Sequence, residues 1–127
     1  MILPSKKLLS TVLQKEILCD DTCSIQLDFI ANEIQYFTPQ TWATNPVRES
    51  INCKILAMLI IERIPNDYKL QCYKTDAGWC SMVGKETEEG KITFMENYFQ
   101  TASEAIYRAG EWILKNITSK QNNNNIP

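Results

Sequence analysis

Hydrophobic residues recur at two different spacings along this chain, and the spacing separates helices from strands. In residues 4–17 the apolar positions fall three and four residues apart, which is the period of an α-helix, and Ser5 stands where an N-cap is needed. From Ile25 to Tyr36 the spacing falls to two, and Ala31 and Asn32 suit the turn between two strands. The first third of the chain therefore predicts a helix followed by a β-hairpin.

The middle of the chain contains its most apolar stretch. Asn45 and Pro46 are a typical helix start, because proline at the first helical position gives up an N–H that would have no partner there. Over residues 46–64 apolar side chains cover most of the circumference of a helix, which Pro65 ends. Such a helix is expected to be buried on more than one side. A buried strand at residues 55–61 is the alternative, which the length of the pattern disfavours.

Three strand-like segments follow, at residues 67–75, 78–84 and 91–99. A tight turn at residues 76–78 joins the first two segments, and the charged stretch "GKETEEG" joins the second and third. Because both connections are short, we expect these strands to form an antiparallel meander.

The last periodic segment, residues 101–118, predicts a helix that covers the sheet. Thr101 and Glu104 form a capping-box pattern, in which each side chain binds a backbone N–H of the first turn. Gly110 in mid-helix costs about 1 kcal/mol relative to alanine, so a neighbouring element, most simply the sheet, is expected to approach it closely. The polar stretch "SKQNNNNIP" at residues 119–127 is expected to be a disordered tail.

Together these elements predict an α+β fold, with an antiparallel sheet (the N-terminal hairpin plus the three-stranded meander) packed with three helices. Residues 1–118 are expected to form a single domain, long enough to bury a core without disulfides. No stretch approaches the roughly 20 apolar residues that span a bilayer, and the N-terminal segment lacks the pattern of a secretion signal. We therefore expect a cytoplasmic protein with no membrane partner.

Composition removes several classes of function. The chain has no histidine, which is the commonest general base and metal ligand and a member of every Ser-His or Cys-His pair. A formal net charge of -2 with scattered lysines argues against direct nucleic-acid binding. The five cysteines are expected to be reduced. Only Cys19, Cys23, Cys72 and Cys80 could form a four-thiolate zinc site, and their spacing does not fit a zinc ribbon. We predict no catalytic, cofactor-binding or metal-binding residue.

The candidate binding residues are therefore those expected at the surface. Tyr73 is expected on the strand face that points away from the core, and Tyr107 on the outward side of the last helix, where tyrosines often act as binding hot spots. Glu86, Glu88 and Glu89 crowd the charged loop, which is most simply a solvated loop tip. These five are the predicted protein-binding residues.

Residues 3–17, "LPSKKLLSTVLQKEI", and residues 97–116, "NYFQTASEAIYRAGEWILKN", resemble the two ends of small hypothetical proteins from bacteriophages and prophages. Those proteins open with a helix of the "LPSKELLSEVL" kind and close with an "EAIxxAxEWIL" helix, and they are similar to phage α/β/α sandwich domains. The shared motifs are a cap and an apolar face, so the resemblance brings no catalytic residue with it. It implies an accessory protein that works by binding a host protein, for example by inhibiting a defence factor with an acidic surface that imitates nucleic acid.

Non-enzymatic binding of a host protein is therefore the leading functional hypothesis. One alternative is a small-ligand or nucleotide binder, or a minor hydrolase that uses the carboxylates around Asp20, Asp21 and Asp28. Another is a structural homo-oligomer, in which exposed apolar residues of the helix at 46–64 meet a symmetry mate.

Overall fold

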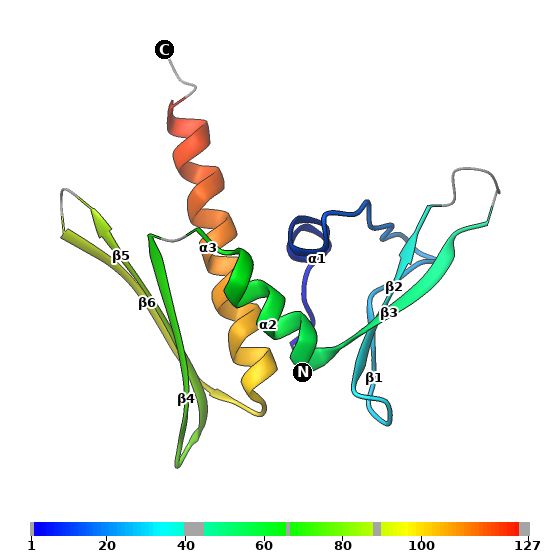
Figure 1. Cartoon of the computed structure of the whole chain (residues 1–127), viewed down its shortest axis with the longest axis horizontal. Coiled ribbons are helices and arrows are strands. Elements are labelled where there is room, and N and C mark those ends of the chain that lie inside the picture. The colour runs from blue at the N-terminus through cyan, green and yellow to red at the C-terminus, as the bar shows by residue number, and fades with distance from the viewer. Residues whose placement is uncertain (1, 40–44, 66, 88–89, 125–127) are drawn as a thin grey trace.

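The computed structural model describes residues 2–39, 45–65, 67–87 and 90–124, with backbone only at 86–87, 90–93 and 118–124 (Figure 1). Within those residues the chain has three helices and two antiparallel three-stranded sheets, which is an α+β fold. The helices are α1 (Lys6–Leu13), α2 (Cys53–Arg63) and α3 (Ala102–Asn124). The first sheet has the order β1 (Gln26–Asp28), β2 (Glu33–Thr38), β3 (Val47–Asn52), and the second the order β4 (Tyr68–Thr75), β5 (Gly78–Thr87), β6 (Gly90–Phe99).

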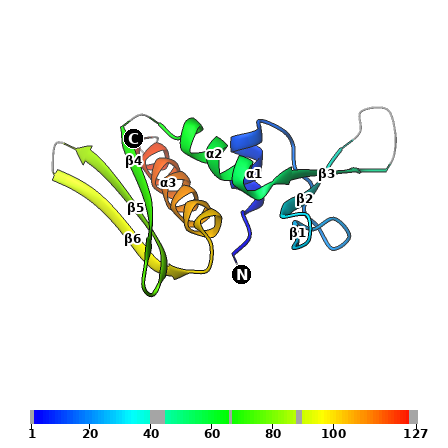
Figure 2. The same ribbon diagram turned by 60° about the horizontal axis from the view of Figure 1, so that its bottom comes forward.

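The three helices separate the two sheets (Figures 1 and 2). Helix α3 packs along the inner face of the β4–β6 sheet, and α2 crosses over the side of α3 that faces away from that sheet. Helix α1 packs against both α2 and α3. The expected single sheet is therefore wrong in one detail, because the hairpin and the meander lie in separate sheets on opposite sides of the helices.

Strand β3 occupies the first third of the segment that the sequence predicts as a helix. Its residues pair with β2 in antiparallel register, from Thr38 opposite Val47 to Glu33 opposite Asn52. The helix begins only after Asn52, whose side chain accepts hydrogen bonds from the backbone N–H groups of Lys54 (2.9 Å) and Ile55 (3.2 Å). Asn52 is thus the N-cap, and the helix start predicted at Asn45 and Pro46 is wrong.

Two groups of buried side chains meet on α3. On one side, Ile106 and Tyr107 join apolar residues of α1, α2 and β2. On the other side, Ala109 and Ile113 pack on Tyr68 and Val83 of the β4–β6 sheet. Helix α3 is therefore covered on two opposite sides, which makes it the central element of the molecule.

The ends of the helices follow the sequence in part. Ser5 caps α1 as predicted, accepting from Leu8 N at 3.0 Å, and Thr101 Oγ1 accepts from Glu104 N at 3.2 Å. Helix α3 continues to Asn124, so residues 119–124 of the expected disordered tail are helical, and residues 125–127 lie outside the described residues. No helix in the described part of the chain is both long and apolar enough to cross a membrane.

Gly110 allows the three helices to approach one another. A Cβ atom at this position would lie 3.1 Å from Ile60 Cγ2 of α2 and 3.1 Å from Leu8 Cδ1 of α1. The close approach predicted at Gly110 is therefore present, but it comes from two helices and not from the sheet.

Candidate functional site

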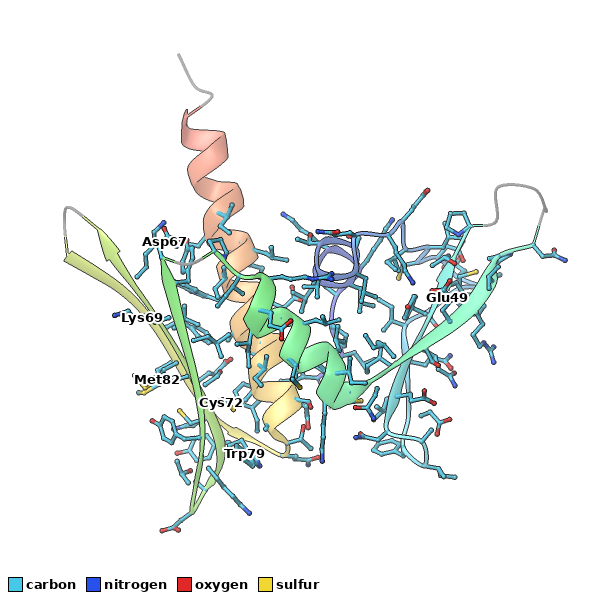
Figure 3. All side chains as sticks on the ribbon, viewed as in Figure 1. Glu49, Asp67, Lys69, Cys72, Trp79 and Met82 are labelled. Carbon is cyan, nitrogen blue, oxygen red and sulfur yellow. The ribbon has the colours of Figure 1, made fainter. Side chains whose placement is uncertain are left out.

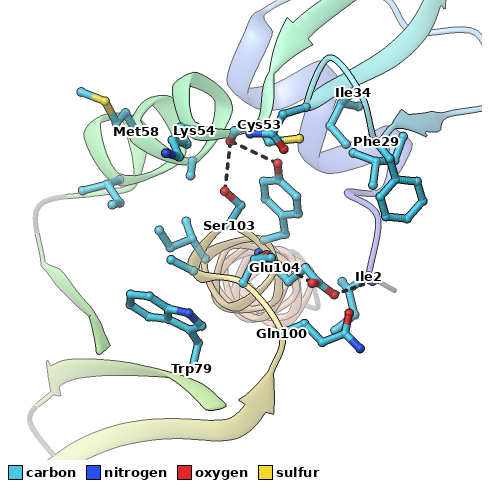
Figure 4. A pocket seen from close by; sticks show the side chains of 18 residues that line it. Ile2, Phe29, Ile34, Cys53, Lys54, Met58, Trp79, Gln100, Ser103 and Glu104 are labelled. Atoms are coloured by element: carbon cyan, nitrogen blue, oxygen red, sulfur yellow. Dashed lines mark hydrogen bonds between the residues drawn. The ribbon is translucent and has the colours of Figure 1, made fainter. Parts of the chain in front are cut away.

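A cavity of about 530 Å³ opens beside the N-terminal ends of α2 and α3 (Figure 4). It extends over the first turn of α3, from Trp79 at the start of β5 to Phe29 in the turn after β1. The lining is mostly apolar and includes Phe29, Met58, Ile61, Trp79, Ile106 and Tyr107. Elements from both halves of the molecule therefore line one cavity, whose volume would suit side chains or a small ligand.

The polar groups on the floor of the cavity bind each other. The Tyr107 hydroxyl donates to the carbonyl oxygen of Cys53 at 3.2 Å, and Ser103 Oγ donates to the same oxygen at 3.4 Å. Burial raises the pKa of Tyr107 above its usual value, so this hydroxyl stays protonated and acts as a donor. These contacts fix α3 to the start of α2 and leave no activated nucleophile there.

Tyr107 is buried, so its predicted place on the outward side of the last helix is wrong. The periodicity of α3 marks one inward face, on which Tyr107 does not fall. Helix α2 covers the side of α3 that the pattern leaves polar, and Tyr107 becomes part of the contact between the two helices. It can contact a partner only from within the cavity.

Glu104 is the acidic residue that lines the cavity, and it is buried there. Its carboxylate accepts from the backbone N–H of Ile2 at 3.0 Å and from the Thr101 hydroxyl at 3.2 Å. A carboxylate at a helix N-terminus also interacts favourably with the helix dipole. Glu104 therefore ties the N-terminal segment to α3, whereas the capping box predicts that it binds a backbone N–H of its own first turn.

Large apolar side chains are exposed at one edge of the cavity. Phe29 is 75% exposed, and Ile30 beside it is 100% exposed. The turn that carries them is fixed by Asp28, whose Oδ1 accepts from the backbone N–H groups of Ile30 and Ala31, both at 3.1 Å. Asp28 therefore holds two large apolar side chains in an ordered turn outside the core, at the edge of the cavity.

Of the other predicted binding residues, Tyr73 lies away from the cavity. Tyr73 is exposed on the outer face of β4, as expected, and its hydroxyl lies 3.6 Å from the sulfur of Met82. Figure 3 shows Met82 on this outer face, whereas Cys72 and Trp79 lie on the face toward α3. The backbone of Glu86 belongs to β5, and Glu88 and Glu89 lie outside the described residues. Of the predicted residues whose side chains the structure describes, Tyr73 is exposed on β4 and Tyr107 is buried beside α2, so these two lie apart.

The acidic residues proposed for hydrolysis stabilise turns. Asp20 Oδ1 accepts from the Thr22 backbone at 2.8 Å, the Thr22 hydroxyl at 2.9 Å and the Cys23 backbone at 2.8 Å. The backbone hydrogen bond from Thr22, followed by that from Cys23, holds the pKa of Asp20 below its usual value. Asp20 and Asp28 are therefore turn anchors, and Asp21 is exposed between them.

The cysteines are free thiols, with Cys19 exposed, Cys72 half-buried and the other three buried. In the part of the chain that the structure describes, no three cysteine, aspartate or glutamate side chains are grouped as metal ligands. The four-thiolate set considered from the sequence is therefore not assembled among these residues.

The chain matches no protein-family model, no curated protein and no solved structure. The assignment of the site consequently depends on its geometry. Sequence reasoning missed Phe29, Met58 and Trp79 as a group, because they come from three separate elements. One signal was available: Phe29 and Ile30 form an apolar pair directly before a turn, where polar residues are usual.

Proposed function

We propose that this protein acts without chemistry of its own, by binding an apolar segment of a partner protein in the cavity beside the first turn of α3. The observation that carries the proposal is the continuity of the apolar cavity with the exposed pair Phe29 and Ile30. The polar groups of the floor are already hydrogen-bonded to one another, so the occupant is recognised by shape and by apolar contact.

A protein segment fits this surface better than a small molecule does. Small-molecule pockets enclose most of their ligand, whereas here the apolar surface continues onto side chains that stand outside the cavity. An occupant that covers Phe29 and Ile30 as well as the cavity must be extended, as a peptide segment is. A small apolar ligand is the second candidate, because a volume of about 530 Å³ suits one.

The phage resemblance of residues 3–17 and 97–116 supplies the biological part of the proposal. In this proposal the protein is an accessory factor of a phage or prophage, and the partner is a host protein that it inhibits, such as a defence factor. A protein that works by occupying a partner's surface requires no catalytic group of its own, and none is recognised among the residues that line the cavity.

The proposal is tested by photo-crosslinking from the edge of the cavity. A photoreactive phenylalanine analogue replaces Phe29 in one variant and Lys69, which is exposed on β4 away from the cavity, in the matched control. Incubation with host lysate should give a discrete crosslinked protein from position 29 and none from position 69. Equal crosslinking from both positions would contradict the proposal.

A second variant connects the crosslink to the cavity itself. Ser103 lines the cavity from α3, with its hydroxyl directed at the Cys53 carbonyl (Figure 4), so Ser103→Phe should occupy part of the cavity. We expect the crosslink from position 29 to fall about tenfold in this background, since the partner loses its buried anchor. A thermal melt checks that the variant is folded. Stabilisation of the wild type by a small apolar compound, lost in Ser103→Phe, would favour the second candidate instead.

A further inference from the structure

The exposed side of α2 carries apolar side chains that the described part of the chain leaves largely uncovered. Ile55 is 53% exposed, Met58 60% and Ile61 43%, whereas Leu56 and Ile60 on the opposite side are fully buried. In Figures 1 and 2 no other element lies over this exposed side. The sequence predicts that α2 is buried on more than one side, and within a single chain it is not.

The exposed side of α2 is symmetric in sequence about Met58. Ile55 and Ile61 each lie three residues from Met58, and the exposed residues Lys54 and Glu62 each lie four residues from it. Positions three and four residues apart share one side of a helix. From either end of the helix, this side therefore shows the same order: a charged residue, an isoleucine, and Met58 at the centre. The two charges, Lys54 and Glu62, have opposite sign.

We propose that two copies of this chain associate through α2, packed antiparallel about a two-fold axis at Met58. In that arrangement Met58 meets Met58 of the partner subunit, and Ile55 meets Ile61 of the partner subunit. Lys54 at one end faces Glu62 of the partner subunit, and the same pair recurs at the other end. A two-fold interface requires such a self-complementary surface.

The charges of α2 are available for this pairing. Among the described residues, neither Lys54 nor Glu62 makes an ion pair or a side-chain hydrogen bond, whereas Lys15 pairs with Glu49 and Arg108 with Glu96. A parallel pairing of the helices would place Lys54 against Lys54 of the partner subunit and Glu62 against Glu62 of the partner subunit. Charge therefore selects the antiparallel arrangement.

The molecule as a whole exposes more surface than a compact monomer of its mass. Its accessible area is 8415 Å². A compact monomer of 14.6 kDa exposes roughly 6,900 Å², so the excess is about 1,500 Å². A standard interface takes about 800 Å² from each partner. The helix α2 is short, so we expect a reversible dimer whose population depends on concentration.

This inference does not rest on the proposed function, which places the partner in the cavity and at Phe29 and Ile30. The two surfaces share Met58 and Ile61, which also line the cavity. Self-association is measured on the purified protein alone, so its failure leaves the crosslinking result at position 29 unaffected.

Sedimentation equilibrium over a range of protein concentrations tests the dimer. The wild type should approach twice the monomer mass of 14.6 kDa as the concentration rises. Lys54→Glu and Glu62→Lys each place like charges at both ends of the interface, and each should weaken the dimer about tenfold. Combining the two substitutions exchanges the charges, so the double variant should recover wild-type association. Lys69→Glu, on β4, makes the same change in net charge as Lys54→Glu and should have no effect.

Met58→Asp provides the strongest disruption, because it places two carboxylates on the two-fold axis, and we expect association to weaken about a hundredfold. Met58 is exposed, so this variant should remain folded, which a thermal melt at low concentration confirms. A wild type that stays monomeric at every concentration would overturn the proposal. So would a dimer in which the double variant is no stronger than the single ones.

Discussion

Helices α2 and α3 both carry broad apolar faces and both lie at the centre of the molecule, yet the apolar residues of α3 are covered more completely than those of α2. The β4–β6 sheet packs on one side of α3, and α1 and α2 pack on the other. Helix α2 packs on α3 and α1 and leaves Ile55, Met58 and Ile61 exposed. The apolar pattern of a helix therefore predicts which of its sides are buried, but it does not predict whether the burying surface belongs to the same chain or to another molecule.

The difference has a second cause in residue size. Helix α3 carries Ala105, Ala109 and Gly110 where its neighbours approach, and these small residues let other elements come close on two sides. Helix α2 buries Cys53, Leu56, Ala57 and Ile60 on one side and carries large aliphatic residues on the other, where no neighbour in the described chain provides matching space. Exposure of the other, apolar side to water costs free energy, and association with a second molecule would remove that cost.

The largest predicted effect is a difference in stability between substitutions at two consecutive residues of α2. Leu56→Ala removes a fully buried side chain between α2, α1 and α3, and the free energy of unfolding should fall by about 2–5 kcal/mol. Ile55→Ala on the exposed side should change it by less than about 0.5 kcal/mol. Urea unfolding followed by circular dichroism, at protein concentrations that keep the chain monomeric, measures both. Equal losses would mean that α2 is buried on both sides in the monomer.

Local sequence signals were sufficient for much of the fold. The cap at Ser5, the three strands of the meander and the helix that begins after Thr101 all depend on neighbouring residues, and the structure contains each of them. The segment at residues 46–64 is an example in which local sequence signals were not sufficient. Asn45 with Pro46 and Asn52 are both acceptable helix starts, and pairing of β3 with β2 decides between them. Strand pairing is a contact that local propensity does not contain.

The candidate site was less accessible to sequence reasoning than the fold. Phe29, Met58 and Trp79 lie in one cavity because the two sheets stand on opposite sides of the helices. The spacing of apolar residues within a segment does not determine on which side of the helices each sheet lies. Tyr107 shows the same limit, since its burial depends on where α2 crosses α3.

Tyr107→Phe tests the polar part of the contact between α2 and α3. The variant keeps the buried ring and loses the hydrogen bond to the Cys53 carbonyl, so the free energy of unfolding should fall by about 1 kcal/mol at neutral pH. Tyr98→Phe, at an exposed tyrosine, is the control and should have no effect. A loss as large for Tyr98→Phe would show that the hydrogen bond is not the cause.

The pH dependence of that variant has a definite sign. The pKa of Tyr107 is raised by burial, so above a pH of about 10 the unfolded chain loses a proton that the folded chain keeps. The stability contributed by Tyr107 is thus fully present below that pH and falls above it. The difference between wild type and Tyr107→Phe should therefore shrink as the pH rises past about 10. A difference that grows with pH would contradict the assignment of this hydroxyl as a buried donor.

Gly110→Ala should have the smallest effect, because two opposing terms nearly cancel. Alanine gains about 1 kcal/mol of helix propensity. Its Cβ atom, however, would lie 3.1 Å from both Ile60 Cγ2 and Leu8 Cδ1, and both neighbours are fully buried in the core. Overpacking costs about 1–3 kcal/mol, and a single added methyl group falls toward the lower end of that range, so we expect a net loss of roughly 1 kcal/mol or less.

The control for this prediction is Lys115→Gly, at an exposed position of the same helix, which measures propensity without a packing term. If Gly110→Ala raised stability by as much as Lys115→Gly lowers it, alanine would fit without displacing α1 or α2. The close approach at Gly110 would then not be what covers α3, and the contrast with α2 would depend on the large side chains of α2 alone. A net loss of stability in Gly110→Ala would show that the absence of a side chain at Gly110 is what allows α1 and α2 to pack closely on α3.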